Sequence, residues 1–255
     1  MDSDTEKDTE FGQIFLGQFM ELFVFPSIEE RQAKGELKKP LNLYAAQIIF
    51  FPDGSKPIIR VNEEVRAIGK VYLKEGVSKK AGDPILYSDI EGLEKIKLTE
   101  EDFADCGHAT FMKFNYTWTI AFDFLYNKYL SNKHIDTAVE FYEVGYVAQK
   151  KQLWSAFVDN LFSACELAAK AILLAMPDKK FREKTTHPII KSRFNRFASL
   201  GNVKEEHKDV LNKLRKIRGK ARYLKGDLKL TEEEAKSMIS TVKEMIDFAR
   251  ERMSY

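Results

Sequence analysis

The chain has 255 residues, of which 44% are hydrophobic and 31% charged, so its composition is that of a core-forming protein and excludes a disordered chain. The length suits two domains of ordinary size or one large domain. The formal net charge is only +2, so the molecule as a whole lacks the strong basic excess of a general nucleic-acid-binding protein.

The amino-terminal segment divides into an acidic part and an apolar part. The first ten residues, MDSDTEKDTE, are acidic, and we predict that residues 1–10 form a disordered tail. The next stretch, FGQIFLGQFMELFVF, is apolar but contains Glu21. We judge it too short for a membrane-spanning helix, and no basic leader of a signal peptide precedes it, so we predict no membrane segment.

Residues 11–130 are predicted to form a strand-rich α+β domain of unknown function. The segment LNLYAAQIIFF runs into a turn at Asp53-Gly54, and the longer segment ATFMKFNYTWTIAFDFLYN alternates aromatic and polar residues, as in a strand or hairpin with one buried face. Between them, LTEEDFADC is predicted to be a short helix with Thr99 as its N-cap. No glycine-rich phosphate loop occurs in this domain.

The alternating segment allows two functional interpretations. Aromatic residues interleave with Lys113 there, and aromatic-plus-basic sheets bind single-stranded nucleic acid in several folds. Half of the aromatics in any sheet must face inward, so we favour a core role for them. A sheet of this kind would also offer a docking face for a protein partner.

From Asp136 onward the apolar residues recur at helical spacing. The run from Asp136, its predicted N-cap, to Met176 is too long for one ordinary globular helix, so we split it near Lys150-Lys151 into two antiparallel helices. Cys165 lies in the apolar part of this run and is predicted to be in the core. His134 precedes the run and is interpreted as a residue of the boundary between the domains.

Three further helices complete the predicted bundle of residues 131–255. The segment IIKSRFNRFASLGNV ends at the C-cap pair Gly201-Asn202. The segment KEEHKDVLNKLRKIRGKARYL presents one apolar face, made of Val210, Leu211, Leu214 and Ile217. The last helix starts at a capping box of Thr231 and Glu234.

The order of these segments resembles that of the HEPN family. The similar segments are YEVGYVAQKKQLWSAFVDNLFSACELAAKAILL, THPIIKSRFNRFASLGN and LNKLRKIRGKARYLKGDLKLTEEEA, which together cover about residues 136–252. Many members of this family are metal-independent ribonucleases whose signature is an arginine followed, after four to six residues, by a histidine. The resemblance implies an up-and-down helical bundle, no cofactor, and a homodimer that pairs two signature helices through the helical domain.

This sequence departs from the signature at its histidine. Six residues lie between Arg215 and Arg222, which stands where the family has the histidine, whereas only three lie between Arg218 and Arg222. An arginine stays protonated and cannot readily act as a general base, but it binds phosphate with two parallel hydrogen bonds. We therefore predict a non-catalytic protein of defence or stress response that binds RNA or a nucleotide with Arg215, Arg218, Arg222 and Tyr223.

The charge distribution around these arginines agrees with a phosphate-bearing partner. From Lys179 to Lys225 the chain has many Lys and Arg and few carboxylates, which raises the local potential. The solvated surface of a helical bundle gives the same pattern, so that interpretation stays open. For Tyr223 we weigh stacking on a base or a hydrogen bond to a phosphate against packing of its ring on the neighbouring helix, and we favour packing.

Two alternatives to the non-catalytic prediction stay open. The first is a toxin-like ribonuclease that has recruited His187, which stands beside Pro188 before the third helix, although we favour a loop histidine with a packing or capping role. The second is a structural or regulatory module whose amino-terminal domain docks a protein. Glu166 forms either an i, i+4 ion pair with Lys170 or an orienting contact to an arginine of the signature helix.

The remaining residues with chemical potential carry weaker signals. His207 lies in a charged helix start and is predicted to be solvated, and His108 follows Cys106-Gly107 without further metal ligands at suitable spacing. The two cysteines give neither a disulfide framework nor a zinc pattern, which fits a reducing cytoplasm.

Overall fold

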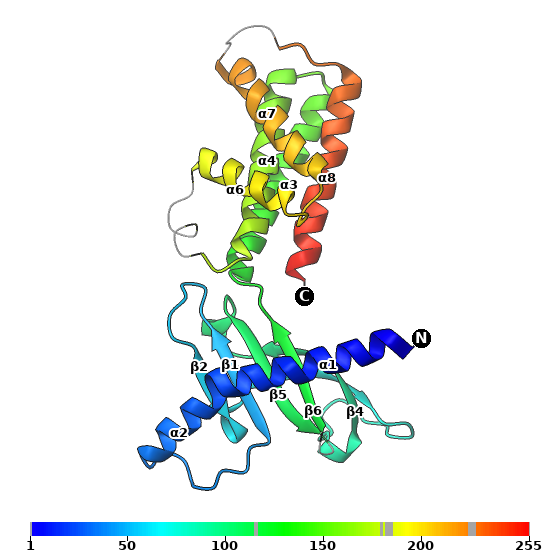
Figure 1. Ribbon diagram of the computed structural model, residues 1–255. Coiled ribbons are helices and arrows are strands. Elements are labelled where there is room, and N and C mark those ends of the chain that lie inside the picture. Colours follow the sequence, from blue (N-terminus) through cyan, green and yellow to red (C-terminus); the bar gives the residue numbers. More distant parts are fainter. Residues whose placement is uncertain (1, 115–116, 179–180, 182–185, 224–227, 255) are drawn as a thin grey trace. The chain divides into compact units, whose positions relative to one another are not determined.

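The chain has an α+β fold made of two compact units. A computed structural model describes residues 2–114, 117–178, 181, 186–223 and 228–254. Its first unit, Met1–Phe124, holds the strands, and its second, Leu125–Tyr255, is helical (Figure 1). The fold class that the sequence predicts, a strand-rich domain followed by an up-and-down helical bundle, is confirmed.

Two separate sheets form the strand-rich unit. Strands β1 (Ala45–Phe50), β2 (Ile58–Val61), β5 (Gly107–Phe114) and β6 (Thr117–Asp123) make an antiparallel sheet of order β2-β1-β5-β6. Strands β3 (Ala67–Leu73) and β4 (Ile90–Leu98) form a hairpin of their own. The central strand β1 has no polar face because both of its sides are covered, which explains its nearly continuous apolar run.

Short 3-10 turns connect these strands. They are η2 (Asn62–Glu64), η3 (Tyr87–Asp89) and η4 (Glu101–Phe103). The predicted helix capped by Thr99 is wrong: this segment makes only the single turn η4, which follows Glu100 without a side-chain cap. Three residues are too few to propagate a helix, and Glu100 is engaged elsewhere, with Arg60, at 2.7 Å.

A helical layer that the sequence analysis did not predict covers one face of the four-stranded sheet. It consists of α1 (Asp2–Phe19), the π-helical turn η1 (Met20–Val24) and α2 (Phe25–Ala33) (Figure 1). The structure places residues 2–10, for which the sequence predicts a disordered tail, in the first turns of α1. By length and composition alone, Phe11–Ala33 is long and apolar enough to cross a membrane, whereas we judged its apolar stretch too short.

Aromatic rings attach this layer to the sheet. Phe15, Phe19 and Phe23 recur every four residues and therefore share one side of the helix. Phe15 lies 5.1 Å from Phe122, between ring centroids, and Phe23 meets Phe50 edge-on at 5.4 Å. Such geometries add to the free energy of burial, so this side of the helix is fixed to the sheet.

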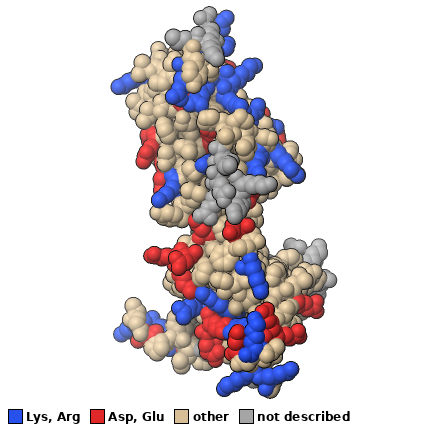
Figure 2. Space-filling model, turned by 90° about the vertical axis from the view of Figure 1, so that its left-hand side faces the viewer, with Lys and Arg blue, Asp and Glu red and all other residues tan. Residues whose placement is uncertain are grey.

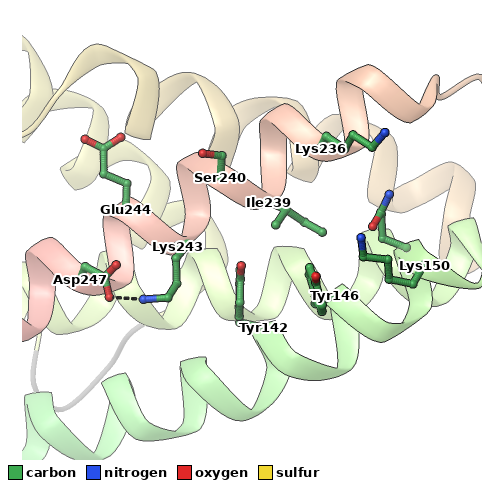
Figure 3. A pocket seen from close by; sticks show the side chains of 10 residues that line it. Tyr142, Tyr146, Lys150, Lys236, Ile239, Ser240, Lys243, Glu244 and Asp247 are labelled. Carbon is green, nitrogen blue, oxygen red and sulfur yellow. Dashed lines mark hydrogen bonds and ion pairs between the residues drawn. The ribbon is translucent and has the colours of Figure 1, made fainter.

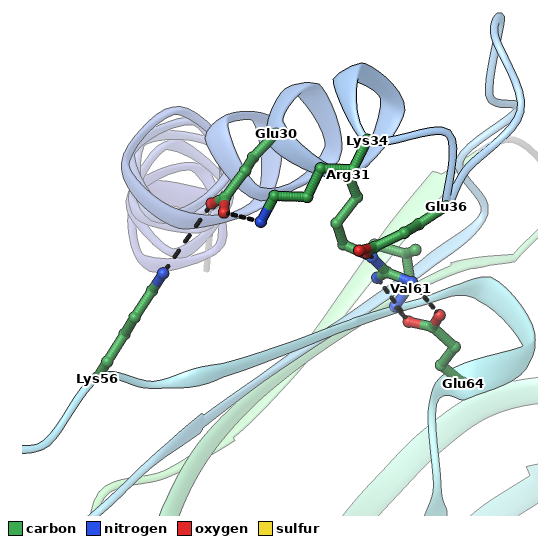
Figure 4. Close-up of polar contacts among 7 residues, drawn as sticks. All are labelled: Glu30, Arg31, Lys34, Glu36, Lys56, Val61 and Glu64. Atoms are coloured by element: carbon green, nitrogen blue, oxygen red, sulfur yellow. Dashed lines mark hydrogen bonds and ion pairs between the residues drawn. The ribbon is translucent and has the colours of Figure 1, made fainter.

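A polar network holds the end of α2 to the sheet edge (Figure 4). Arg31 donates two hydrogen bonds to the carboxylate of Glu64, one of them 2.9 Å long. Glu64 also accepts a hydrogen bond of 3.1 Å from the backbone N–H of Val61. The Arg31 guanidinium, opposed by partial burial, lowers the pKa of Glu64. Glu30 bridges Lys34, the residue after α2, and Lys56, in the loop between β1 and β2.

The helical unit is built around one central helix. Helices α3 (Lys128–Lys150) and α4 (Trp154–Leu174) form the predicted antiparallel hairpin, with the break where the sequence predicts it. Three further helices, α6 (His187–Ser199), α7 (Glu205–Tyr223) and α8 (Glu232–Met253), pack on α4. Residues of α4 are buried along its whole length, and Cys165 is fully buried among them, as predicted.

The start of α3 differs from the prediction. Asp136 is not an N-cap, because α3 begins two turns earlier, after Asn127. Asn127 adopts the left-handed conformation (φ 53°), and its buried side-chain amide donates to the carbonyl oxygen of Leu174 at 2.9 Å. That long-range bond has no local sequence signature. His134 consequently lies within α3 of the second unit and not at the point of the chain where the two units join.

Two other predicted helix ends are confirmed. Gly201 has a φ of 77°, and its N–H donates to the carbonyl of Ala198 at 2.8 Å, which closes α6. Thr231 and Glu234 form the reciprocal capping box of α8, with both hydrogen bonds at 3.1 Å.

Candidate functional site

One side of α4 carries charged and aromatic residues in an otherwise apolar helix. Asp159, Phe162 and Glu166 are spaced by three and four residues and therefore share one face. Helix α6 brings His187 to this face, and helix α7 brings Arg218 and Arg222. We call these six residues the α4 site: Asp159, Phe162, Glu166, His187, Arg218 and Arg222.

Arg218 is held from two directions. Its Nε donates to Oδ1 of Asp159 at 2.8 Å, and its guanidinium lies 4.5 Å from the ring centroid of the buried Phe162. The side chain is 19% exposed. Because the ion pair and the cation–π contact act together, the orientation of Arg218 is set before any ligand arrives.

Arg222 contacts the same carboxylate, but its side chain is held less closely and is more exposed than that of Arg218. Its Nη1 lies 3.4 Å from Oδ1 of Asp159, and its side chain is 48% exposed. Two guanidinium groups therefore face one carboxylate, which leaves an excess of positive charge at the end of α7. A guanidinium has five N–H donors, and the contact with Asp159 is the only hydrogen bond of Arg222 to the described residues.

The two other predicted binding residues flank this pair on α7. Arg215 is half-buried and forms no ion pair with the part of the chain that the structure describes. Tyr223 is 62% exposed, and the guanidinium of Arg222 lies 6.0 Å from its ring centroid. An exposed ring beside guanidinium groups is the arrangement that proteins use to stack a base next to a bound phosphate.

His187 and Glu166 form a second pair at the α4 site. His187 is the first residue of α6, and its Nδ1 contacts Oε2 of Glu166. The imidazole ring lies 5.9 Å from the ring centroid of Phe162, so Phe162 contacts both His187 and Arg218. The imidazole is largely exposed, whereas the side chain of Glu166 is only 12% exposed.

The expected roles of Glu166 need correction. Glu166 does not orient an arginine of α7, and its described hydrogen-bond partner is His187 and not Lys170. The residue that orients the arginines is Asp159, which the sequence analysis missed. The available signal was its spacing: Asp159 stands seven residues before Glu166 and therefore on the same face of an apolar helix.

Two further titratable side chains extend this face of α4 towards α3. Burial and, to a smaller extent, the charge of Lys170 lower the pKa of His134 to about 4. Burial also lowers the pKa of Lys170, although Glu166 opposes this shift. His134 is therefore neutral near pH 7.

The remaining histidines have structural environments. His207 is not solvated as predicted: it is 1% exposed and its ring lies 6.1 Å from that of Phe248, because α8 packs over the start of α7. Buried His108 lies 3.1 Å from the hydroxyl of Thr110, between Nδ1 and Oγ1. Among the described residues, no three metal-ligating side chains lie together.

The helical unit presents a basic surface at the end of α7. Figure 2 shows Lys and Arg side chains predominating on this end of the unit, with few Asp and Glu among them. The arginines of the α4 site thus stand within a wider positive potential, which is suited to a phosphate-bearing ligand.

A groove of about 650 Å³ lies elsewhere on this unit, between α3 and α8 (Figure 3). The rings of Tyr142 and Tyr146 stack along it at 6.5 Å, and Lys243 pairs with Asp247 across one end. None of the predicted site residues lines it. Because Lys236 and Lys243 have carboxylate partners and Lys150 lies over the ring of Tyr146, we do not assign the groove a ligand.

Comparison with known proteins agrees with the helical architecture. Residues 131–252 match the family model described as HEPN domain, which confirms the resemblance and covers the α4 site in full. No curated protein matches the chain.

Proposed function

Because residues 131–252 are a HEPN domain, we propose that this protein binds the phosphate groups of RNA or of a nucleotide at the end of α7 without cleaving them. The observation that carries the proposal is the pairing of two guanidinium groups, Arg218 and Arg222, with the single carboxylate of Asp159. An incoming phosphate would replace or share this carboxylate. It would then accept charge-assisted hydrogen bonds from donors that are already oriented.

The absence of a base at the signature position supports binding over cleavage. Cleavage through the RNA 2′-hydroxyl needs a group that removes its proton, and a guanidinium stays protonated at any physiological pH. Arg222 stands where the family signature has this histidine. The residues that hold an anion are therefore kept in the signature helix, and the residue that moves the proton is not.

We also propose that the protein acts as a homodimer through its helical unit. A two-fold axis near α7 would bring two copies of Arg215, Arg218 and Arg222 to one groove. A doubled site would strengthen phosphate binding and its dependence on salt, because more counterions are released from the nucleic acid.

The test is salt-dependent binding of a labelled RNA, followed by fluorescence anisotropy between 50 and 200 mM salt. We expect the variant Arg218→Ala/Arg222→Ala to bind at least about tenfold more weakly and to lose roughly one to two units of the salt slope per site. The matched control is Lys213→Ala/Lys220→Ala, which removes the same charge from exposed positions on the opposite side of the same helix. Equal losses in both variants would contradict a site at Arg218 and Arg222.

A metal-independent ribonuclease is the second candidate, and one observation favours it. His187 is paired with Glu166 and contacts the same Phe162 ring as Arg218, so a proton-transfer group and a phosphate-binding group flank one ring. The test is incubation of labelled RNA with the protein in EDTA. Cleavage that is lost in both His187→Asn and Arg218→Ala would establish this candidate, and no cleavage above buffer would remove it.

A further inference from the structure

The helical layer of the strand-rich unit has a second apolar side, turned away from the sheet. Phe11, Ile14, Leu22 and Phe25 are 59%, 53%, 69% and 46% exposed. These are large side chains on one continuous helical segment, whose other side is already packed on the sheet through Phe15 and its neighbours. A row of this kind on a folded surface marks a place where another surface binds.

The spacing of the row is symmetric. The four exposed apolar residues and the exposed Gln18 lie along one line of the helix. We call these five residues the apolar seam: Phe11, Ile14, Gln18, Leu22 and Phe25. The intervals are three, four, four and three residues; this is the spacing of the contact line in paired α-helices, and the second half of the row runs through the π-helical turn Met20–Val24. The intervals are the same in both directions along the chain. An antiparallel pair of copies would therefore set Ile14 opposite Leu22 of the second copy, and Gln18 opposite Gln18.

Gly17 stands next to the centre of this symmetric row. A Cβ added at Gly17 would meet no atom within 4 Å, so the surface there is open and the backbone is uncovered. A small residue next to the two-fold axis lets two helices approach closely. The amides of two Gln18 side chains can then hydrogen-bond to each other across the axis, which satisfies the one polar position of the seam.

Charge decides the direction of the pairing. Residues 2–10 have five carboxylates and one lysine, and the antiparallel register about Gln18 sets them opposite residues 26–34, which have two carboxylates and two basic residues. A parallel pair would bring the two acidic ends together. An antiparallel pair sets each acidic end against a segment without net charge, which avoids this repulsion.

A lipid surface fits the same side less well. Glu21 is exposed on the helix between Gln18 and Leu22, and the acidic end would be repelled by anionic headgroups. We propose that the apolar seam is an isologous interface, in which the seams of two copies of this chain pack antiparallel about a two-fold axis at Gln18. This interface is independent of the phosphate site and of the pairing of helical units.

Directed disulfide cross-linking tests the register. The two natural cysteines are buried, so they give little background. Two full-length proteins of different tag length are mixed, one with Ile14→Cys and one with Leu22→Cys, and oxidised. We expect the mixed-length product to dominate over both same-length products. Dominant same-length products would show parallel pairing, and no product above that of a Gln13→Cys pair would show that the seams do not meet; either result overturns the proposal.

A second measurement distinguishes binding of the seam to a second copy from binding to a membrane. Sedimentation of Leu22→Glu should show association weakened by about tenfold or more, because a carboxylate would enter an apolar contact, while Gln13→Glu adds the same charge outside the seam and should behave as the wild type. Unchanged association in Leu22→Glu overturns the proposal. Flotation with neutral vesicles that is lost in Leu22→Glu would assign the seam to lipid instead. Arg218→Ala/Arg222→Ala should leave the cross-link unchanged.

Discussion

At the scale of single residues, Asp159 decides how the arginines of α7 behave. It occupies the donors that a phosphate would use, so the carboxylate both orients Arg218 and competes with the ligand. The stacking of Arg218 on Phe162 keeps the guanidinium in place when the carboxylate is displaced. Asp159 is therefore expected to weaken binding while keeping the site ordered.

Replacement of Asp159 by asparagine should separate these two effects. Asp159→Asn removes the competing charge, so we expect RNA to bind roughly three- to tenfold more tightly at low salt. The free energy of unfolding should fall by about 1–3 kcal/mol, because Arg218 loses a charged partner in a partly buried position. Anisotropy and urea unfolding measure the two quantities, and weaker RNA binding by a fully folded variant would contradict competition by Asp159.

His134 should make stability depend on pH. Its pKa in the folded state is about 4, below the ordinary value of 6.5, so protonation favours the unfolded state. The free energy of unfolding should therefore fall as the pH decreases from about 6.5 to about 4, by roughly 2 kcal/mol from this residue. Burial also lowers the pKa of His207, which adds a loss in the same direction.

The variant His134→Gln checks this contribution. It should flatten the pH dependence of urea unfolding between pH 6.5 and 4 and leave the dependence between pH 7 and 8 as in the wild type. Parallel stability curves for the wild type and His134→Gln over the whole range would show that His134 is not the titrating group.

At the scale of elements, periodicity predicted the helices of the second unit and failed for those of the first. The stripes of α7 and α8 have one apolar side each, and local sequence reveals the cap residues Thr231 at the start of α8 and Gly201 after the end of α6. Helix α1 and its continuation are apolar on two sides, one against the sheet and one in the seam. This removes the polar side that a helical pattern requires.

The packing of α3 on α4 gives a prediction at this scale. A Cβ added at Gly145 would lie 3.4 Å from the backbone nitrogen of Leu161, an ordinary contact, so Gly145→Ala should change the free energy of unfolding by less than about 1 kcal/mol. A longer side chain would push the helices apart, so Gly145→Leu should cost about 1–3 kcal/mol. Urea unfolding of both variants measures this, and equal stability would show that the helices do not pack closely at Gly145.

The α4 site was only half visible in the sequence, for a physical reason. The arginines of α7 lie within one short segment, and the signature pattern identifies them. Their partner Asp159 lies 59 residues before Arg218, and the pair His187 and Glu166 is 21 residues apart. Such contacts arise from the packing of α6 and α7 on α4, which no local pattern encodes.

At the scale of the whole molecule, the small net charge conceals an uneven distribution. Between Lys179 and Lys225 the sequence has sixteen Lys and Arg against four Asp and Glu, while residues 2–10 are acidic. The first surplus includes the arginines of α7, and the acidic residues 2–10 precede the apolar seam. A chain with an average close to neutrality can therefore hold a phosphate in one unit and pair with a second copy through the other.

The most direct measurement of the central claim is photo-cross-linking to RNA that contains 4-thiouridine, followed by mass spectrometry of the peptides. If the end of α7 binds RNA, the main cross-link should fall on the peptide that contains Tyr223, and it should decrease severalfold in Arg218→Ala/Arg222→Ala but not in Lys213→Ala/Lys220→Ala. Cross-links confined to the strands of the first unit, or equal in all three proteins, would contradict the account.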